Sequence, residues 1–228
     1  RRRFVGAAQD GQVLVFDMKG ERLASFGTRG PRTGQIDAYQ GITARDGQIF
    51  IADSLNKRLQ SYTESGTLLW AMPETDVNRS GPSNVATTTG DGSGSAGVPD
   101  FRWDLPQDII FDGNGRLIVV DAFRFEIAVV DPKTGLVQAS YGEFGRLDGQ
   151  FFYPTSIAYD AERDWFAVAD TQNDRVQIVQ IPDSASSVVA PVWRAASSPY
   201  RHLLVPALLI AGAALISVFT GRRLFRRA

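Results

Sequence analysis

The amino-acid sequence predicts an all-β domain built from repeats and followed by one apolar helix. Short apolar runs recur between Gly, Asp, Asn and Pro residues, which is the pattern of strands separated by turns. Helical periodicity is nearly absent before residue 200, whereas one uninterrupted apolar stretch lies close to the C-terminus. These observations separate a β-rich domain from a single hydrophobic helix.

The expected strands are apolar runs of three to six residues, which are too short for helices. They lie at 13–16, 49–52, 68–70, 117–120, 127–130, 166–169 and 176–181.

Two stretches, 51–62 and 168–179, share one frame: hydrophobe-Ala-Asp-Ser/Thr-x-Asn-x-Arg-hydrophobe-Gln. Such self-similarity is the signature of a repeat architecture. The polar positions of the frame are Asp53, Asn56 and Arg58 in the first copy and Asp170, Asn173 and Arg175 in the second.

Two weaker copies extend the repeat. Residues 120–130 keep the Asp of the frame as Asp121 but carry Glu126 in place of its Arg, and residues 5–16 carry Ala7 in place of its Asp. Successive Asp positions are 46, 68 and 49 residues apart. Two intervals suit one β-propeller blade, and the long one implies an insertion.

Other elements recur in phase with the frame. A Pro-x-x-Ile pattern precedes it at 106–109 and 154–157, and a Gly turn with a further apolar run follows at 20–27, 66–70 and 135–142. Each unit therefore predicts four strands joined by turns.

These units resemble NHL repeats, the blades of a β-propeller. Besides the two frames, the stretch 149–160 has the form that leads into such a blade, and 90–106 is similar to an insertion between blades in some bacterial NHL proteins. The resemblance covers about residues 4–182 and implies a ring of about six blades. About four are visible, the first without its inner strands, so we expect upstream blades or a partner to complete the ring.

The sequence divides into four parts. We expect a propeller over 1–182, a Ser/Ala/Pro-rich linker over 183–200, a transmembrane helix over 201–221 and a basic tail over 222–228.

The membrane span rests on residues 203–219, which contain no charge. A buried core helix is the alternative, but such a helix is amphipathic, whereas this stretch is apolar all round. Its small residues form a face that allows close packing against another helix. The anchor positions are Leu203, Pro206, Ala207, Ala211, Gly212 and Phe219.

Positive charge sets the expected orientation, because Arg and Lys stay on the cytoplasmic side. We expect a single-pass protein of the cell (inner) membrane, with the C-terminus in the cytoplasm and the propeller outside it. A signal peptide or an earlier membrane helix is then expected upstream of residue 1. The arginines that follow the span are Arg222, Arg223, Arg226 and Arg227.

Composition excludes several classes of chemistry. The chain has no cysteine, which rules out disulfides, Cys-bound zinc and thiol catalysis and favours a bacterial periplasmic or cell-surface setting. The one histidine, His202, lies beyond the propeller, so a Ser-His-Asp relay within the propeller is excluded. Residues 1–183 hold 18 basic and 25 acidic residues, which argues against a nucleic-acid partner.

The repeated Asp and Arg positions allow two interpretations: a row of binding groups, or pairs inside each blade that fix turns and satisfy backbone donors. Recurrence at one blade position favours the second. No cofactor is expected, and calcium held by carboxylates of several blades is an alternative without assignable ligands. The stretch 112–116 resembles a calcium loop only faintly and predicts a hairpin turn.

Together these features favour a non-catalytic protein-interaction module: an accessory or assembly subunit of a membrane protein complex, whose partners are other subunits and the lipid bilayer. One alternative is a metal (calcium)-dependent propeller hydrolase or lyase. Another is an extracytoplasmic ligand sensor, although the short tail 222–228 leaves little room for a cytoplasmic output domain.

Overall fold

The computed structural model describes residues 3–7, 10–73 and 101–185 of the 228-residue chain. Within these ranges the regular elements are fourteen β-strands and one short 3-10 turn, η1 (Thr171–Asn173). The all-β class predicted from the apolar runs is therefore confirmed.

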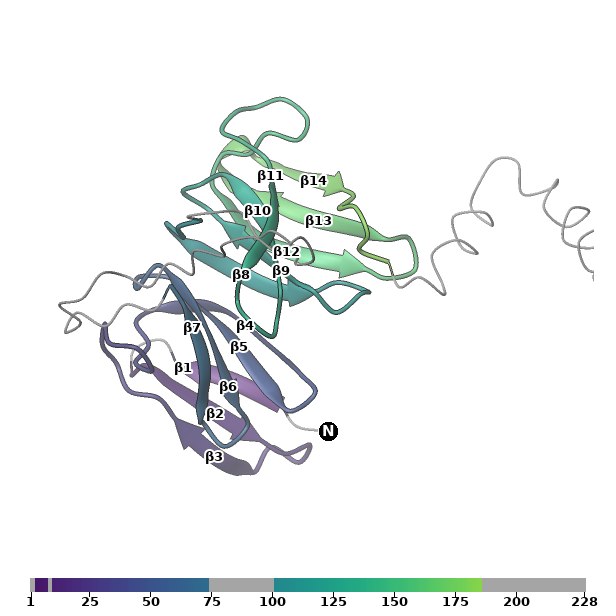
Figure 1. The fold of residues 1–228 in the computed structure, drawn as a ribbon. Coiled ribbons are helices and arrows are strands. Elements are labelled where there is room, and N and C mark those ends of the chain that lie inside the picture. Colours follow the sequence, from purple (N-terminus) through teal and green to yellow (C-terminus); the bar gives the residue numbers. More distant parts are fainter. Residues whose placement is uncertain (1–2, 8–9, 74–100, 186–228) are drawn as a thin grey trace, which may run out of the picture.

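The strands form four antiparallel sheets, in which neighbours in sequence are neighbours in space (Figure 1). The strand orders are β1-β2-β3, β4-β5-β6-β7, β8-β9-β10-β11 and β12-β13-β14. Their bounds are β1 (Arg3–Ala7), β2 (Gln12–Phe16), β3 (Arg22–Phe26), β4 (Tyr39–Arg45), β5 (Gln48–Asp53), β6 (Arg58–Thr63), β7 (Leu68–Met72), β8 (Pro106–Phe111), β9 (Leu117–Asp121), β10 (Glu126–Val130), β11 (Val137–Tyr141), β12 (Pro154–Asp160), β13 (Trp165–Asp170) and β14 (Arg175–Val179).

The four sheets stack face to face in chain order, with an apolar core between each pair. Strand β9 shows the consequence: Leu117 and Val119 belong to the core shared with the second sheet, while Ile118 and Val120 belong to the core shared with the fourth. A strand buried on both faces reads as a continuous apolar run, which is why the sequence shows no alternation there.

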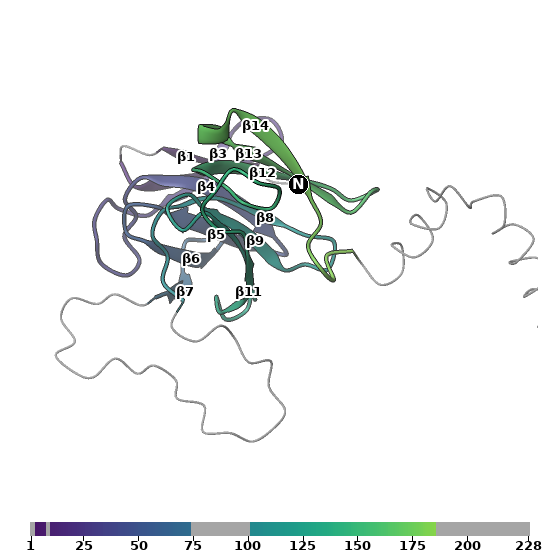
Figure 2. The same cartoon turned by 90° about the horizontal axis from the view of Figure 1, so that it is seen from above.

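First strands of successive sheets lie together, because β8 contacts both β4 and β12. Figure 2 shows the outer strands β7 and β11 on the side away from β4 and β12. This radial arrangement of meandering sheets is that of a β-propeller arc.

The structure corrects the expected strand count at both ends of the arc. By its match to β5, strand β1 is the second strand of a blade, so the first sheet lacks only its innermost strand among the described residues. The fourth sheet has three described strands instead of the four predicted. Its last strand ends at Val179, because Ile181 leaves the sheet and packs into the neighbouring core.

Several predictions concern parts of the chain outside the described residues. The interblade insertion lies mostly within 74–100, and the linker after residue 185, the membrane span 201–221 and the basic tail 222–228 all lie outside the described residues. No helix in the described ranges is long and apolar enough to cross a membrane.

Close packing of the inner strands makes Gly41 in β4 a test of the radial arrangement. A Cβ at this position would lie 2.7 Å from both the Asp108 Cα and the Ile109 nitrogen of β8. We expect Gly41→Ala to lower the free energy of unfolding by about 1–3 kcal/mol, since backbone would have to move. Urea denaturation measures this, with the exposed neighbour substitution Gln40→Ala as control; equal stability of the two variants would contradict the packing of β4 on β8.

Candidate functional site

One end of the sheets gathers the turns that join second and third strands and the connections that lead into the next sheet. We call this end the loop face. Backbone hydrogen bonds tie each turn to its connection, as from the Gln172 nitrogen to the Phe152 oxygen (3.0 Å) and from the Ala122 nitrogen to the Leu105 oxygen (3.0 Å). The turns are 54–57, 122–125 and 171–174, and the connections are 27–38, 101–105 and 142–153.

In the second sheet, Asp53 is the centre of a buried polar network. Its carboxylate accepts hydrogen bonds from the Asp37 backbone nitrogen (2.7 Å), Arg58 Nε (2.9 Å) and Gln60 Nε2 (2.9 Å), as well as from Asn56 Nδ2. The side chains of Asp53 and Arg58 are both 0% exposed. The guanidinium also donates to backbone carbonyls of the connection, so the pair fixes the loop and leaves no free carboxylate.

The fourth sheet repeats this network around Asp170. The carboxylate accepts from the Phe152 nitrogen (2.7 Å), Asn173 Nδ2 (2.8 Å), Arg175 Nε (2.8 Å) and Gln177 Nε2 (3.0 Å). Here the arginine side chain is 27% exposed, so water reaches this copy of the pair.

In the third sheet, the buried carboxylate is satisfied without an arginine. Strand register places Asp121 opposite Glu126, where the other sheets pair Asp with Arg. Asp121 instead accepts backbone N–H groups from Asp104, Leu105, Phe123 and Arg124. The repeat positions therefore come together within each sheet and serve the turns, and they do not line a common site.

The electrostatics of the three carboxyls differ. Burial raises the pKa of Asp53 and of Asp121, against the opposing effect of their hydrogen bonds. Burial acts in the same direction on Asp170, but hydrogen bonds from Phe152, Asn173 and neighbouring side chains outweigh it and hold the pKa of Asp170 below its usual value.

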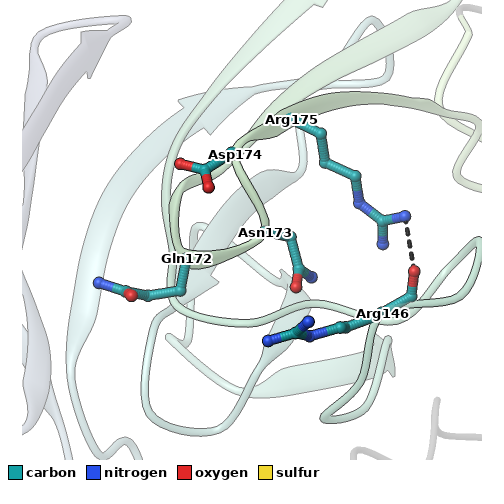
Figure 3. Close-up of a pocket in the computed structure, with 5 residues that line it drawn as sticks. All are labelled: Arg146, Gln172, Asn173, Asp174 and Arg175. Carbon is teal, nitrogen blue, oxygen red and sulfur yellow. Dashed lines mark hydrogen bonds between the residues drawn. The ribbon is translucent and has the colours of Figure 1, made fainter.

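Beside the Asp170 network the loop face is hollowed by a cavity of about 170 Å³ (Figure 3). Its lining residues come from the 171–174 turn, the start of β14 and the preceding connection. They are Arg146, Gln172, Asn173, Asp174 and Arg175. The Oδ1 atom of Asn173 is buried and has no hydrogen-bond partner within the described structure.

Sequence reasoning identified Asn173 and Arg175 as frame positions but did not identify the cavity. Arg146 and Asp174 were missed, because they occupy variable positions of the repeat. The only available signal was a difference between copies: Arg146 stands where the second sheet has Pro31, and Asp174 where it has Lys57.

An aromatic patch lies on the connection 142–153, which also carries Arg146 of the cavity, and on the turn 122–125. Ring centroids are 5.0 Å apart for Phe125 and Phe144, 5.2 Å for Phe144 and Phe152, and 5.6 Å for Phe123 and Tyr153. Phe123 is 51% exposed and Phe144 is 61% exposed. We define the aromatic patch as Phe123, Phe125, Phe144, Phe152 and Tyr153.

The part of the chain that the structure describes contains no candidate metal site. No group of three or more His, Asp or Glu side chains there could hold an ion. The stretch 112–116 forms the predicted hairpin turn: Asp112 Oδ1 accepts from the backbone nitrogens of Asn114 (3.0 Å) and Arg116 (2.8 Å). Its carboxylate is thus already engaged by the turn.

Comparison with known proteins supports the fold alone. No family model and no curated protein matches the chain. An auxiliary nutrient binding protein from Bacteroides ovatus is similar with a TM-score of 0.55 and 19% identity, over 78% of this chain and 45% of that one. One from Bacteroides thetaiotaomicron gives 0.53 and 16%, over 77% and 44%. Virginiamycin B lyase from Staphylococcus aureus gives 0.46 and 12%, over 82% and 57%.

The match therefore spans less than half of each nutrient binding protein. At these identities the comparison supports the β-propeller fold and leaves activity to be argued from the site.

The two Asp–Arg pairs differ in burial, so we expect the loss of each arginine to lower the free energy of unfolding by a different amount. We expect Arg58→Leu to lower the free energy of unfolding by about 3–5 kcal/mol, because the Asp53 charge would remain buried without its partner. Arg175→Leu should cost clearly less, since its pair is reached by water. Urea denaturation tests the order, with the surface substitution Arg163→Leu as control; a loss for Arg58→Leu no larger than the control would contradict it.

The lowered pKa of Asp170 predicts a pH dependence. Its ionised form stabilises the folded state, so this contribution is complete above the unfolded pKa of about 3.9 and is lost as pH falls through the lower folded pKa. The stability difference between the wild type and Asp170→Asn should therefore be constant from about pH 7 to 5 and shrink below about pH 4. A difference that grows on acidification would show the opposite sign.

Proposed function

We propose that this chain is a non-catalytic protein-interaction module that docks a partner protein through its loop face. The observation that carries the proposal is the aromatic patch, in which Phe123 and Phe144 expose about half or more of their surface. Contiguous exposed aromatic side chains are costly in water and mark sites of protein–protein contact.

The patch rests on loops that are held in place by hydrogen bonds. Phe152 lies in the connection 142–153 and its backbone nitrogen donates to Asp170, and Phe123 lies in the turn 122–125 and its backbone nitrogen donates to Asp121. Docking on such loops costs little conformational entropy, which favours binding. The nutrient binding names of the two similar structures agree with a binding role, although that likeness concerns the fold.

We further propose that the propeller is of the NHL type and lies outside the cytoplasm as an accessory or assembly subunit of a membrane protein complex. The supports are the two repeat frames, the uncharged stretch 203–219 and the arginine-rich tail 222–228. In this proposal, 201–221 anchors the chain in the lipid bilayer and packs against helices of other subunits.

Purification of the full chain in mild detergent, followed by mass spectrometry of co-eluting proteins, tests this function. We expect stoichiometric membrane partners, and at least a tenfold loss of one of them with the double substitution Phe123→Ser and Phe144→Ser, because hot-spot aromatics contribute about 2 kcal/mol or more each.

The matched control is Leu136→Ser, which removes an apolar residue that is 48% exposed in the turn between β10 and β11, at the other end of the sheet. If the wild type elutes alone with bound calcium, the accessory-subunit proposal fails and the metal-dependent enzyme takes its place.

A further inference from the structure

The cavity on the loop face contains an acceptor that lacks a donor. Both hydrogens of Asn173 Nδ2 are engaged, by the Gly145 carbonyl (2.9 Å) and by Asp170 Oδ2 (2.8 Å), which fixes the orientation of the amide. The Oδ1 atom is left buried without a partner in the described structure. A buried acceptor of this kind is stabilised by a ligand that brings an N–H or O–H group.

The two sides of the cavity carry opposite charges. Figure 3 shows Asn173 between the guanidinium of Arg146 and the carboxylate of Asp174. Arg175 is occupied, because its nitrogens bind Asp170 and the carbonyls of Arg146, Leu147 and Gln150. Arg146 takes part through its carbonyl only, so its guanidinium forms none of the hydrogen bonds or ion pairs found among the described residues.

The turn-fixing role of the repeat positions does not explain the charged lining of this cavity. Asn56 in the second sheet makes the same two hydrogen bonds, to Gly30 and Asp53, and so serves its turn equally well. Its neighbours differ, however, since Pro31 and Lys57 stand where the cavity has Arg146 and Asp174. The charged pair is therefore an addition to the repeat in the fourth sheet relative to the second.

A ligand that fits must offer a carboxylate to Arg146 and an N–H donor close beside it. An arginine fork binds carboxylates in a bidentate manner. A simple anion would be repelled by Asp174, and a simple cation by Arg146. The last residue of a polypeptide carries both required groups on adjacent atoms, a free carboxylate and a backbone N–H.

We propose that the cavity binds the C-terminal residue of a partner polypeptide, with its carboxylate on Arg146 and its last N–H on Asn173 Oδ1. The cavity volume of about 170 Å³ is more than ten times what one water requires, which leaves room for a residue. Phe144 is exposed and only two residues from Arg146, so the aromatic patch offers the nearest apolar surface for the terminal side chain. This proposal rests on the proposed docking function.

Ligand-observed NMR on the full chain in detergent micelles tests the site with N-acetyl-glycyl-leucine as probe. We expect a dissociation constant on the order of 1 mM, as is usual for a ligand of this size. The C-terminal amide of the probe should bind about tenfold more weakly, and the analogue with an N-methylated leucine several-fold more weakly, because each lacks one of the two groups.

Protein variants locate the site. Arg146→Gln should weaken the free acid about tenfold and leave the melting temperature unchanged, since its guanidinium supports no described contact. Arg163→Gln, which removes an arginine from the β12–β13 turn at the other end of the sheet, should change neither quantity.

Four results would overturn the proposal: equal binding of acid and amide, no effect of Arg146→Gln, acetate binding as tightly as the peptide, or free leucine binding more tightly than the peptide. Acetate would identify a plain anion site, and leucine a site for free amino acids. Partner loss in the Phe123 and Phe144 double variant is measured separately, so failure here is distinguishable from failure of the docking function.

Discussion

The structure depends on one recurring interaction: a buried carboxylate at the end of the second blade strand that accepts a backbone N–H from the incoming connection. Asp53, Asp121 and Asp170 each accept such a bond at 2.7 Å, from Asp37, Asp104 and Phe152. The carboxylate thereby fixes the path of the chain as it enters the second, third and fourth sheets. Because it is buried, it must be satisfied completely, and two solutions appear: an Arg–Asn–Gln set in two sheets and backbone nitrogens alone in the third.

This constraint also shapes the binding surface. Each connection is held by several hydrogen bonds to its carboxylate network, so side chains that point away from the network are free to vary without loss of the loop. Phe144, which is largely exposed, and Arg146 and Asp174, which line the cavity, occupy such positions. A conserved internal scaffold with variable outward side chains is how a repeat protein acquires one specific site among similar blades.

The sequence was sufficient to predict the features that recur in each unit. The frame, the Gly turns and the Pro-x-x-Ile pattern predicted four units of strands joined by turns, because each of these signals depends on local chemistry. It was insufficient where the outcome depends on packing between segments. The early end of β14 follows from Ile181 entering a core, and the cavity from the juxtaposition of Arg146 with a turn that lies 26 to 28 residues further along the chain. Neither of these two features produces a repeating pattern in the sequence.

One face of the fourth sheet packs on the third sheet, and the opposite face indicates whether the ring of blades is complete. Trp165, Val176 and Ile178 alternate with core residues and are 42%, 65% and 57% exposed. The same alternation in β9 is buried on both sides. A face with the apolarity of an interior blade is disfavoured in water and gains by being covered. The prediction that further blades or a partner complete the ring therefore rests on the cost of leaving this apolar face in water.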